Sequence, residues 1–233
     1  MDKQFVIKEF KKNNLPLDES QAEAFLAYMD FLLEENSKYN LTAITKPEEI
    51  VIKHFIDSCF AIWCIDENSS IIDIGAGAGF PSIPLAILRK DCRFTLVDSL
   101  RKRTDFLNQL IKRLNLSNCS VVWSRGEDLA VKAQYREQFD YCMARAVAQL
   151  NTLTEYCLPF VKVGGKMIAY KSKEVENELN QAKKAINILG GRLYSLEKIF
   201  LEEMDRNLVL IEKISKTPNK YPRKQNKPKT NPL

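Results

Sequence analysis

One segment constrains the fold of this chain more than any other: residues 71–81, which read IIDIGAGAGFP. Apolar residues run directly into three alternate glycines, and a further apolar segment begins without a break. This order indicates a buried strand, a tight loop and the start of a helix. Glycine has no Cβ, so the main chain of such a loop can lie against a ligand.

A second apolar segment, residues 93–98, ends in the carboxylate of Asp98, 23 residues beyond Gly75. An acid about 20 residues after a glycine-rich strand–helix loop is placed to accept hydrogen bonds from ribose hydroxyls. The two segments therefore predict a nucleoside-containing cofactor at the carboxyl edge of a parallel sheet. A glycine-rich turn without a ligand is the alternative, and the matched acid argues against it.

The spacing of the glycines separates two classes of cofactor. The dinucleotide fingerprint G-x-G-x-x-G needs a glycine where this chain has Phe80, and the third glycine falls one residue early, at Gly79. Asp73 adds negative charge, which a cationic or zwitterionic ligand tolerates better than a pyrophosphate does. The pattern D-x-G-x-G-x-G resembles the first motif of S-adenosylmethionine (SAM) methyltransferases. We therefore expect Asp73, Gly75, Gly77 and Gly79 to bind SAM.

Strand and helix patterns alternate along the chain after residue 70. Strands are expected at 70–74, 93–98, 119–123, 138–144 and 164–171, and helices at 80–89, 100–114, 150–160 and 173–189. This rhythm predicts an α/β, Rossmann-like fold with a doubly wound, mostly parallel sheet. The last two apolar segments, 192–201 and 208–214, leave no room for a helix between them, so residues 202–207 should turn an antiparallel strand pair.

Two helices are expected before the first strand. Asp18 can cap the first, 18–39, with Gln21 as its capping-box partner. Pro47 opens the second, which should run to about Cys64. We expect three parts: an N-terminal helical cap (1–66), a SAM-binding core (67–215) and a C-terminal tail (216–233).

Charge is unevenly distributed along the chain. The chain carries +5 at pH 7, but the tail holds six basic side chains, four prolines and no acid, so the rest is close to −1. Proline-rich basic composition predicts a flexible tail, suited to a polyanion such as RNA or serving only solubility. Six cysteines without a C-x-x-C pair indicate reduced thiols in the cytoplasm. We expect no metal, since the chain has one histidine, and no membrane partner, since no apolar run approaches the ~20 residues of a span.

Further candidates follow from the strand ends, where ligands bind in open α/β sheets. Gly126 and Glu127 follow the third strand, where SAM methyltransferases usually hold adenine. Arg125 and Arg145 follow the third and fourth strands and favour a polyanionic methyl acceptor. His54 and Asp57, by their helical spacing, are interpreted as structural. Trp63 and Trp123 are expected to pack in the core or against the cofactor.

Five runs in the chain together resemble the glucose-inhibited division protein B family, the bacterial small-subunit ribosomal RNA guanine-N7 methyltransferases. They read YNLT (39–42), KHFIDS (53–58), DIGAGAGFPSIPL (73–85), VDSLRKR (97–103) and ARA (144–146). The resemblance extends from about Leu17 to Ile214. It implies a SAM-dependent enzyme that methylates N7 of a guanosine in 16S ribosomal RNA, with the RNA or the small ribosomal subunit as partner, and a monomer is expected.

The resemblance also assigns residues. It places SAM contacts at Gly75, Phe80, Gly126, Glu127 and Arg145, and the ribose acid at Asp98. The basic side chains expected to bind RNA are Arg101, Lys102, Arg103, Arg125, Arg145 and Lys171. Ser172 stands where the family often has glycine, which leaves the RNA role of Lys171 open.

Guanine N7 carries a free lone pair, so the implied chemistry needs positioning and not a general base. The catalytic residue therefore stays unassigned, with Arg145 as a candidate. Two other classes of protein stay open. A methyltransferase of a small molecule or protein would share the cofactor site, and a non-catalytic RNA-binding module would bind no SAM.

Overall fold

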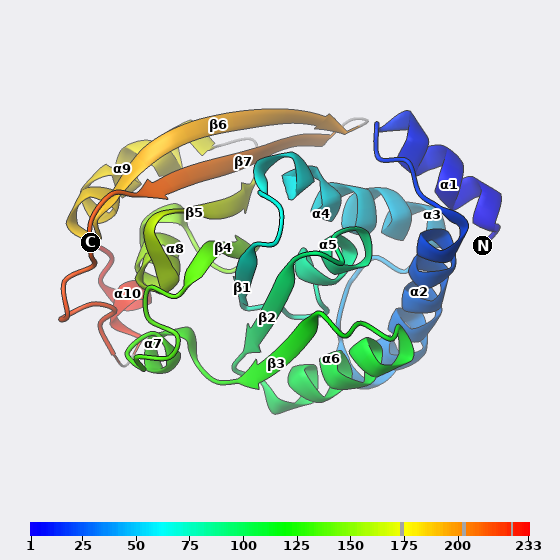
Figure 1. Cartoon of the computed structure of the whole chain (residues 1–233), viewed down its shortest axis with the longest axis horizontal. Helices are drawn as coiled ribbons and strands as arrows, with labels where there is room; N and C mark the ends of the chain where they lie inside the picture. Colours follow the sequence, from blue (N-terminus) through cyan, green and yellow to red (C-terminus); the bar gives the residue numbers. More distant parts are fainter. Residues whose placement is uncertain (173–174, 202–203, 225) are drawn as a thin grey trace.

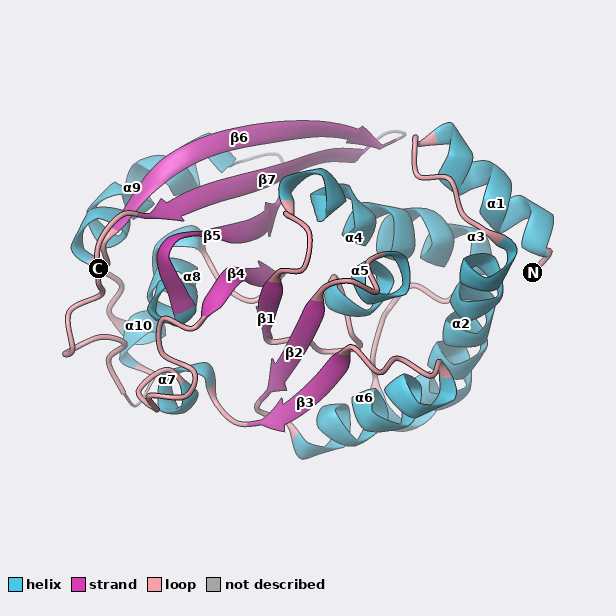
Figure 2. Cartoon of the chain, in the orientation of Figure 1, coloured by secondary structure: helices cyan, strands magenta, loops and turns pink. Residues whose placement is uncertain are grey.

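The computed structural model describes residues 1–172, 175–201, 204–224 and 226–233 of the chain. Within these ranges the strands form one sheet in the order β3-β2-β1-β4-β5-β7-β6 (Figures 1 and 2). The strands are β1 (Ser70–Ile74), β2 (Arg93–Asp98), β3 (Cys119–Trp123), β4 (Phe139–Arg145), β5 (Val161–Lys171), β6 (Gly191–Leu201) and β7 (Met204–Lys213). Strands β1 to β5 pair in parallel, whereas β7 is antiparallel to both β5 and β6. The predicted doubly wound sheet with a closing antiparallel pair is confirmed.

Residues alternate between the two faces of the sheet, as the strand period requires. Ile71 packs into one hydrophobic cluster and its neighbour Ile72 into the other. Helices α5 (Ser82–Leu88) and α6 (Arg101–Arg113) cover the first face, and α8 (Leu150–Cys157) and α9 (Val175–Ile188) cover the second. Strand order reverses between β1 and β4, which makes their carboxyl ends the expected ligand site.

The N-terminal helices pack over the first face. Helix α2 (Glu19–Tyr39) has the predicted capping box between Asp18 and Gln21. Helix α1 (Lys3–Lys12), which we did not predict, is capped by Asp2 and buries Val6 and Phe10. Those two apolar residues stand four apart in a basic segment, a weak signal for a helix.

The second predicted helix is continuous but irregular. It consists of α3 (Pro47–Ile50), a π-helical turn (Val51–Ile56), α4 (Asp57–Cys59) and a 3₁₀ turn (Phe60–Cys64). A π-helical turn is rare and often occurs at functional sites. This one carries His54 and leads directly into Asp57, and both residues reappear in the site below.

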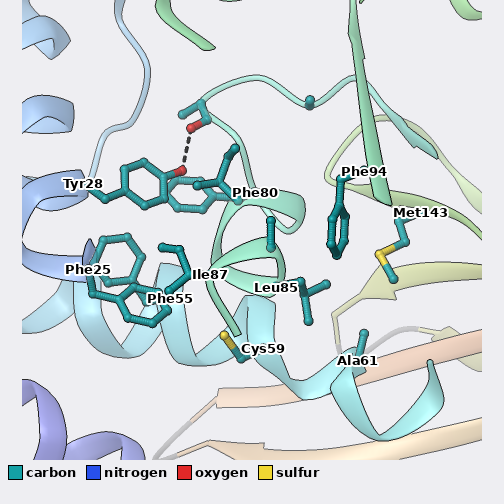
Figure 3. Close-up of a cluster of buried hydrophobic side chains, with 14 of the residues drawn as sticks. Phe25, Tyr28, Phe55, Cys59, Ala61, Phe80, Leu85, Ile87, Phe94 and Met143 are labelled. Atoms are coloured by element: carbon teal, nitrogen blue, oxygen red, sulfur yellow. Dashed lines mark hydrogen bonds between the residues drawn. The ribbon is translucent and has the colours of Figure 1, made fainter. Parts of the chain in front are cut away.

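An aromatic cluster joins these helices to the glycine loop (Figure 3). The ring of Tyr28 packs at 5.0 Å from that of Phe55 and at 5.4 Å from that of Phe80. Its hydroxyl donates a 2.6 Å hydrogen bond to the carbonyl of Ala78, in the loop. Since Tyr28 is fully buried, this bond fixes the loop against the helical cap.

Three expectations need correction. Trp63 and Trp123 are 67% and 57% exposed, so their predicted core packing is wrong. Trp123 lies on edge strand β3, where its indole N–H donates to the carbonyl of Ser99 at 3.0 Å.

The C-terminal segment 216–233 differs from the expected flexible arm, because Tyr221 and Pro228 are buried and Arg223 pairs with the buried Glu155. Proline prevented a long helix there, but it did not prevent packing.

Further findings concern the cysteines and the helices of the described residues. All six cysteines are free, and four of them are buried. None of the described helices has the length and apolar character that crossing a bilayer requires. The predicted start of the helix at 173 and part of the predicted turn, 202–203, lie outside the described residues.

Replacement of Tyr28 by phenylalanine should lower the free energy of unfolding by about 1–3 kcal/mol, because the Ala78 carbonyl is left buried without its partner. Urea unfolding measures this. Tyr39→Phe is the control, since Tyr39 lies in the same helix, its hydroxyl donates to none of the described residues, and its ring packs against Phe106 of α6. Equal stability of the two variants would contradict a structural role for the Tyr28 bond.

Candidate active site

The glycine loop has the backbone that its sequence predicted. Gly75, Gly77 and Gly79 all have positive φ, at 78°, 59° and 101°. A Cβ at Gly79 would lie 2.7 Å from the side chain of Ile83 and 2.9 Å from the hydroxyl of Tyr28. Glycine is therefore required there both by the backbone and by the close approach of the helical cap.

Asp98 lies at the position expected for the acid that binds ribose, and its carboxylate also holds the glycine loop by hydrogen bonds. One carboxylate oxygen accepts from the backbone N–H of Gly77 at 2.9 Å, and the other accepts from that of Leu100 at 2.8 Å. Arg103 approaches the same carboxylate at 3.6 Å. The acid is thus fixed in orientation at the carboxyl end of β2, beside the start of the glycine loop.

A first cavity, of about 370 Å³, opens at the carboxyl ends of β1, β2 and β3. We call it the cofactor cavity. Four of the predicted cofactor residues line it together: Gly75, Asp98, Gly126 and Glu127. Arg103 and Arg125, which we expected to bind RNA, also line it, and Arg125 lies 3.4 Å from Glu127. The four other predicted cofactor residues, Asp73, Gly77, Gly79 and Phe80, are not in its lining, and Arg145 borders the neighbouring cavity.

Asp73 is a buried carboxyl group at the end of β1. Its oxygens and the hydroxyl of Ser82 are buried and form no hydrogen bond of normal geometry with described residues, although the nearby Ser82 acts to lower the pKa of Asp73. Burial raises the pKa of Asp73 to about 7. A cationic group of a ligand bound nearby would favour the charged form of this buried carboxyl.

A second cavity, of about 350 Å³, lies beside the first at the carboxyl ends of β4 and β5. We call it the acceptor cavity. Its basic side chains are Lys53, Arg145, Lys171 and Arg206. Ala146, with a left-handed φ of 57°, lines both cavities and marks the point where they meet.

Asp57 organises the cationic wall of the acceptor cavity. Its carboxylate accepts from Arg145 at 2.8 Å and from Arg206 at 3.1 Å. The guanidinium of Arg145 also lies 4.8 Å from the centre of the Phe80 ring. Phe80 therefore connects the glycine loop to the acceptor cavity, and Arg145 is held by a charge on one side and a ring on the other.

His54 belongs to the same cluster. Its Nε2 lies 2.7 Å from the hydroxyl of Thr42, its Nδ1 lies 3.3 Å from Arg145, and its ring stacks on Phe80 at 4.5 Å. Burial lowers the pKa of His54 to about 4, and the positive charge of Arg145 is the second-largest cause. The imidazole is therefore neutral at pH 7, and it positions its neighbours without adding charge.

The six predicted RNA-binding residues divide into three groups. Arg101 and Lys102 are exposed at the start of α6, and Arg101 pairs with Asp105. Arg103 and Arg125 line the cofactor cavity, whereas Arg145 and Lys171 line the acceptor cavity. Lys171 is only 8% exposed and is bound to Glu178 at 2.6 Å, so internal partners hold it.

Sequence reasoning missed other residues that line these cavities. Arg206 lies within the predicted turn (202–207), at a position that the structure places in β7, and no local pattern marks it. Tyr156 on α8 lines the cofactor cavity, as do Asn226 and Lys229 of the C-terminal segment. The spacing of His54, Asp57 and Ser58 did indicate one helical face, but it did not show which residues pack against that face.

The buried carboxyl of Asp73 should make stability depend on pH. Its pKa is about 7 in the folded chain and about 3.9 in an unfolded one. The folded state thus binds more protons between these values, and Asp73 reduces stability as pH rises from about 4 to about 7. We expect the free energy of unfolding of Asp73→Asn, relative to the native chain, to increase across this window.

His54 is present in both proteins, so its opposite contribution cancels in the difference. Its lowered pKa raises stability with pH over much of the same range, which would mask the effect of Asp73 in the native chain alone. Denaturant titrations at several pH values test the prediction. A difference that stays constant from acid to neutral pH would contradict it.

Comparisons with known proteins identify the family of this chain. The profile of the GidB family, described as rRNA small subunit methyltransferase G, matches residues 21–209. A relative with that name from Acetivibrio thermocellus is 50% identical and covers 93% of this chain and 90% of its own length. Another from Alkaliphilus metalliredigens is 42% identical over the full length of both chains.

Solved structures show the same fold at low sequence identity. TYW2 of M. jannaschii in complex with AdoMet superposes with a TM-score of 0.57 at 16% identity, over 74% of this chain and 80% of its own. A SAM-dependent O-methyltransferase from Thermotoga maritima gives 0.51 at 15%, over 80% and 72%. The sheet is thus that of the SAM methyltransferases, and by sequence the chain belongs to the GidB family, the small-subunit rRNA methyltransferases G.

Proposed function

We propose that this protein is a SAM-dependent methyltransferase that acts on N7 of a guanosine in 16S ribosomal RNA. The observation that carries the proposal is the meeting of two cavities at Ala146. One has the glycine loop and fixed acid of a nucleoside site, and the other is lined by basic side chains. The family to which the chain belongs supports ribosomal RNA as the acceptor.

The residues of the cofactor cavity fit SAM. Asp98 would accept hydrogen bonds from the ribose hydroxyls, with Gly75 leaving room for the cofactor against the main chain. Gly126 and Glu127 would hold the adenine. The buried carboxyl of Asp73 would offset the positive charge of the methionine part through its field. Bound SAM supplies an activated methyl group on its sulfonium.

The acceptor cavity suits a nucleotide of RNA. Asp57 binds both Arg145 and Arg206, and Glu178 binds Lys171. With Lys53, the basic side chains still outnumber the acidic ones in the described lining of the cavity. These groups would hold the phosphates around the target guanosine. Neutral His54 and Arg145 would orient the base, since N7 needs no proton removed before it attacks.

The surface around the cavities extends the proposal to the remaining predicted residues. Arg101 and Lys102, exposed at the start of α6, would contact RNA phosphates beyond the target nucleotide. Arg103 and Arg125 stand at the mouth of the cofactor cavity. We further propose that the enzyme acts as a monomer whose helical cap (1–66) and core (67–215) form one unit.

A methyl-transfer assay tests the proposal directly. The protein is incubated with methyl-labelled SAM and small ribosomal subunits, or their RNA, from cells that lack this gene. We expect label in 7-methylguanosine after nucleoside analysis. Label in another nucleoside would overturn the assigned atom, and bound SAM without labelled RNA would show that the acceptor is a different molecule.

Arg145→Ala should separate acceptor positioning from cofactor binding. Because Arg145 lines the acceptor cavity and not the cofactor cavity, we expect kcat to fall by about 100-fold with an unchanged Kd for SAM. Arg113→Ala is the matched control, an arginine at the far end of α6 that borders neither cavity. A raised Kd for SAM in the Arg145 variant would instead assign this arginine to the cofactor.

A further inference from the structure

The C-terminal segment 216–233 reaches the cofactor cavity. Asn226 and Lys229 line that cavity together with Asp98 and Glu127. Lys229 lies in α10 (Lys227–Thr230), which packs against α8 (Figure 1). Residues more than 100 positions apart in the chain therefore share one wall of the cavity.

Helix α8 holds this segment in place. Glu155 is 1% exposed, and its two oxygens accept from the guanidinium of Arg223 at 2.7, 2.9 and 3.2 Å. The backbone N–H of Arg223 donates to the same carboxylate at 2.7 Å. Thr152, also on α8, donates its hydroxyl to the carbonyl of Pro228 at 2.9 Å, where both groups are buried. Breaking a buried charge pair of this kind is costly, so the contact defines a position.

Arg136 holds the first part of the segment. Its guanidinium donates to the carbonyls of Thr217 at 2.8 Å and Tyr221 at 2.9 Å. Tyr221 itself is 7% exposed. The segment is therefore attached at 217, 221, 223 and 228, on both sides of Asn226. Its position beside the cavity follows from these contacts, one of which is the charge pair of Arg223 with Glu155.

The side chains that the segment presents match the adenosine part of SAM. The amino edge of adenine offers a hydrogen-bond donor next to a ring-nitrogen acceptor, the pattern that an asparagine carboxamide complements. Lysine offers three donors to ring nitrogens or ribose oxygens. Within the cavity, Asp98 and Glu127 lie beside Arg103 and Arg125, and Lys229 adds a third basic side chain to the lining. Tyr156, one residue after Glu155, gives the same wall an aromatic ring.

We propose that the C-terminal segment is part of the cofactor site, with Asn226 and Lys229 contacting the adenosine part of SAM. Glu155 and Thr152 act as positioning residues, because they hold the segment without lining the cavity. Lys229 would thus increase the affinity for the cofactor, so the basic side chains of the segment would not all act on the RNA. The inference rests on the proposed function for the identity of the cofactor.

Binding of S-adenosylhomocysteine (SAH) to the full chain tests this, by calorimetry on three variants. Lys229→Ala and Asn226→Ala should each raise the Kd for SAH by about 3–10-fold. Lys227→Ala is the matched control, since Lys227 is exposed in the same short helix, carries the same charge and does not line the cavity. Its Kd should stay at the native value. RNA affinity, measured in parallel, should be the same for the two lysine variants.

Unchanged SAH affinity in both Lys229→Ala and Asn226→Ala would overturn the inference, and an equal loss of RNA affinity in the two lysine variants would then assign the segment to RNA. The two proposals fail in different ways. A native chain that binds no SAH contradicts the proposed cofactor, and the inference with it. A native chain that binds SAH but labels no RNA contradicts only the acceptor, and the variant comparison keeps its meaning.

Discussion

The hydrogen bond from the hydroxyl of Tyr28 to the carbonyl of Ala78 is the contact on which the site depends. It joins α2, in the helical cap, to the glycine loop at a point where no side chain larger than hydrogen fits, Gly79. The same ring packs against Phe80, and Phe80 in turn supports both His54 and Arg145. A single buried cluster thus sets the loop of the cofactor cavity and the basic wall of the acceptor cavity. A displacement of α2 would affect both cavities at once.

The charged side chains in the wall of the acceptor cavity hold one another in place. Asp57 is nearly inaccessible to water and binds two arginines from strands that are distant in sequence, β4 and β7. Basic side chains outnumber acidic ones in the described lining of this cavity, which suits an anionic acceptor, and the charged hydrogen bonds fix both guanidinium groups. The lowered pKa of His54 belongs to the same arrangement, because a charged imidazole beside Arg145 would add repulsion. A site for a base with a free lone pair requires this kind of ordering more than it requires a proton acceptor.

Local patterns predicted most of the fold, and the errors have physical causes. The capping box at Asp18 and Gln21, the strands β1 to β3 and the glycine loop depend on neighbouring residues, and all are found as predicted. Trp123 was misplaced because a large apolar ring in a strand is usually buried, whereas β3 is an edge strand and leaves it exposed. The tail was misread because composition alone cannot reveal the buried carboxylate of Glu155, which neutralises Arg223.

By itself the sequence determined the doubly wound sheet, the helical cap and the position of the glycine loop with Asp98, since each follows from periodicity or spacing along a short stretch. Its motifs also identified the family. Only the tertiary structure decided which residues share a cavity. It brought His54, Arg145 and Arg206 around Asp57, and it brought Asn226 and Lys229 to the cofactor cavity. These groups come from segments separated by more than 150 residues in the chain, and only packing of the whole chain sets their distances.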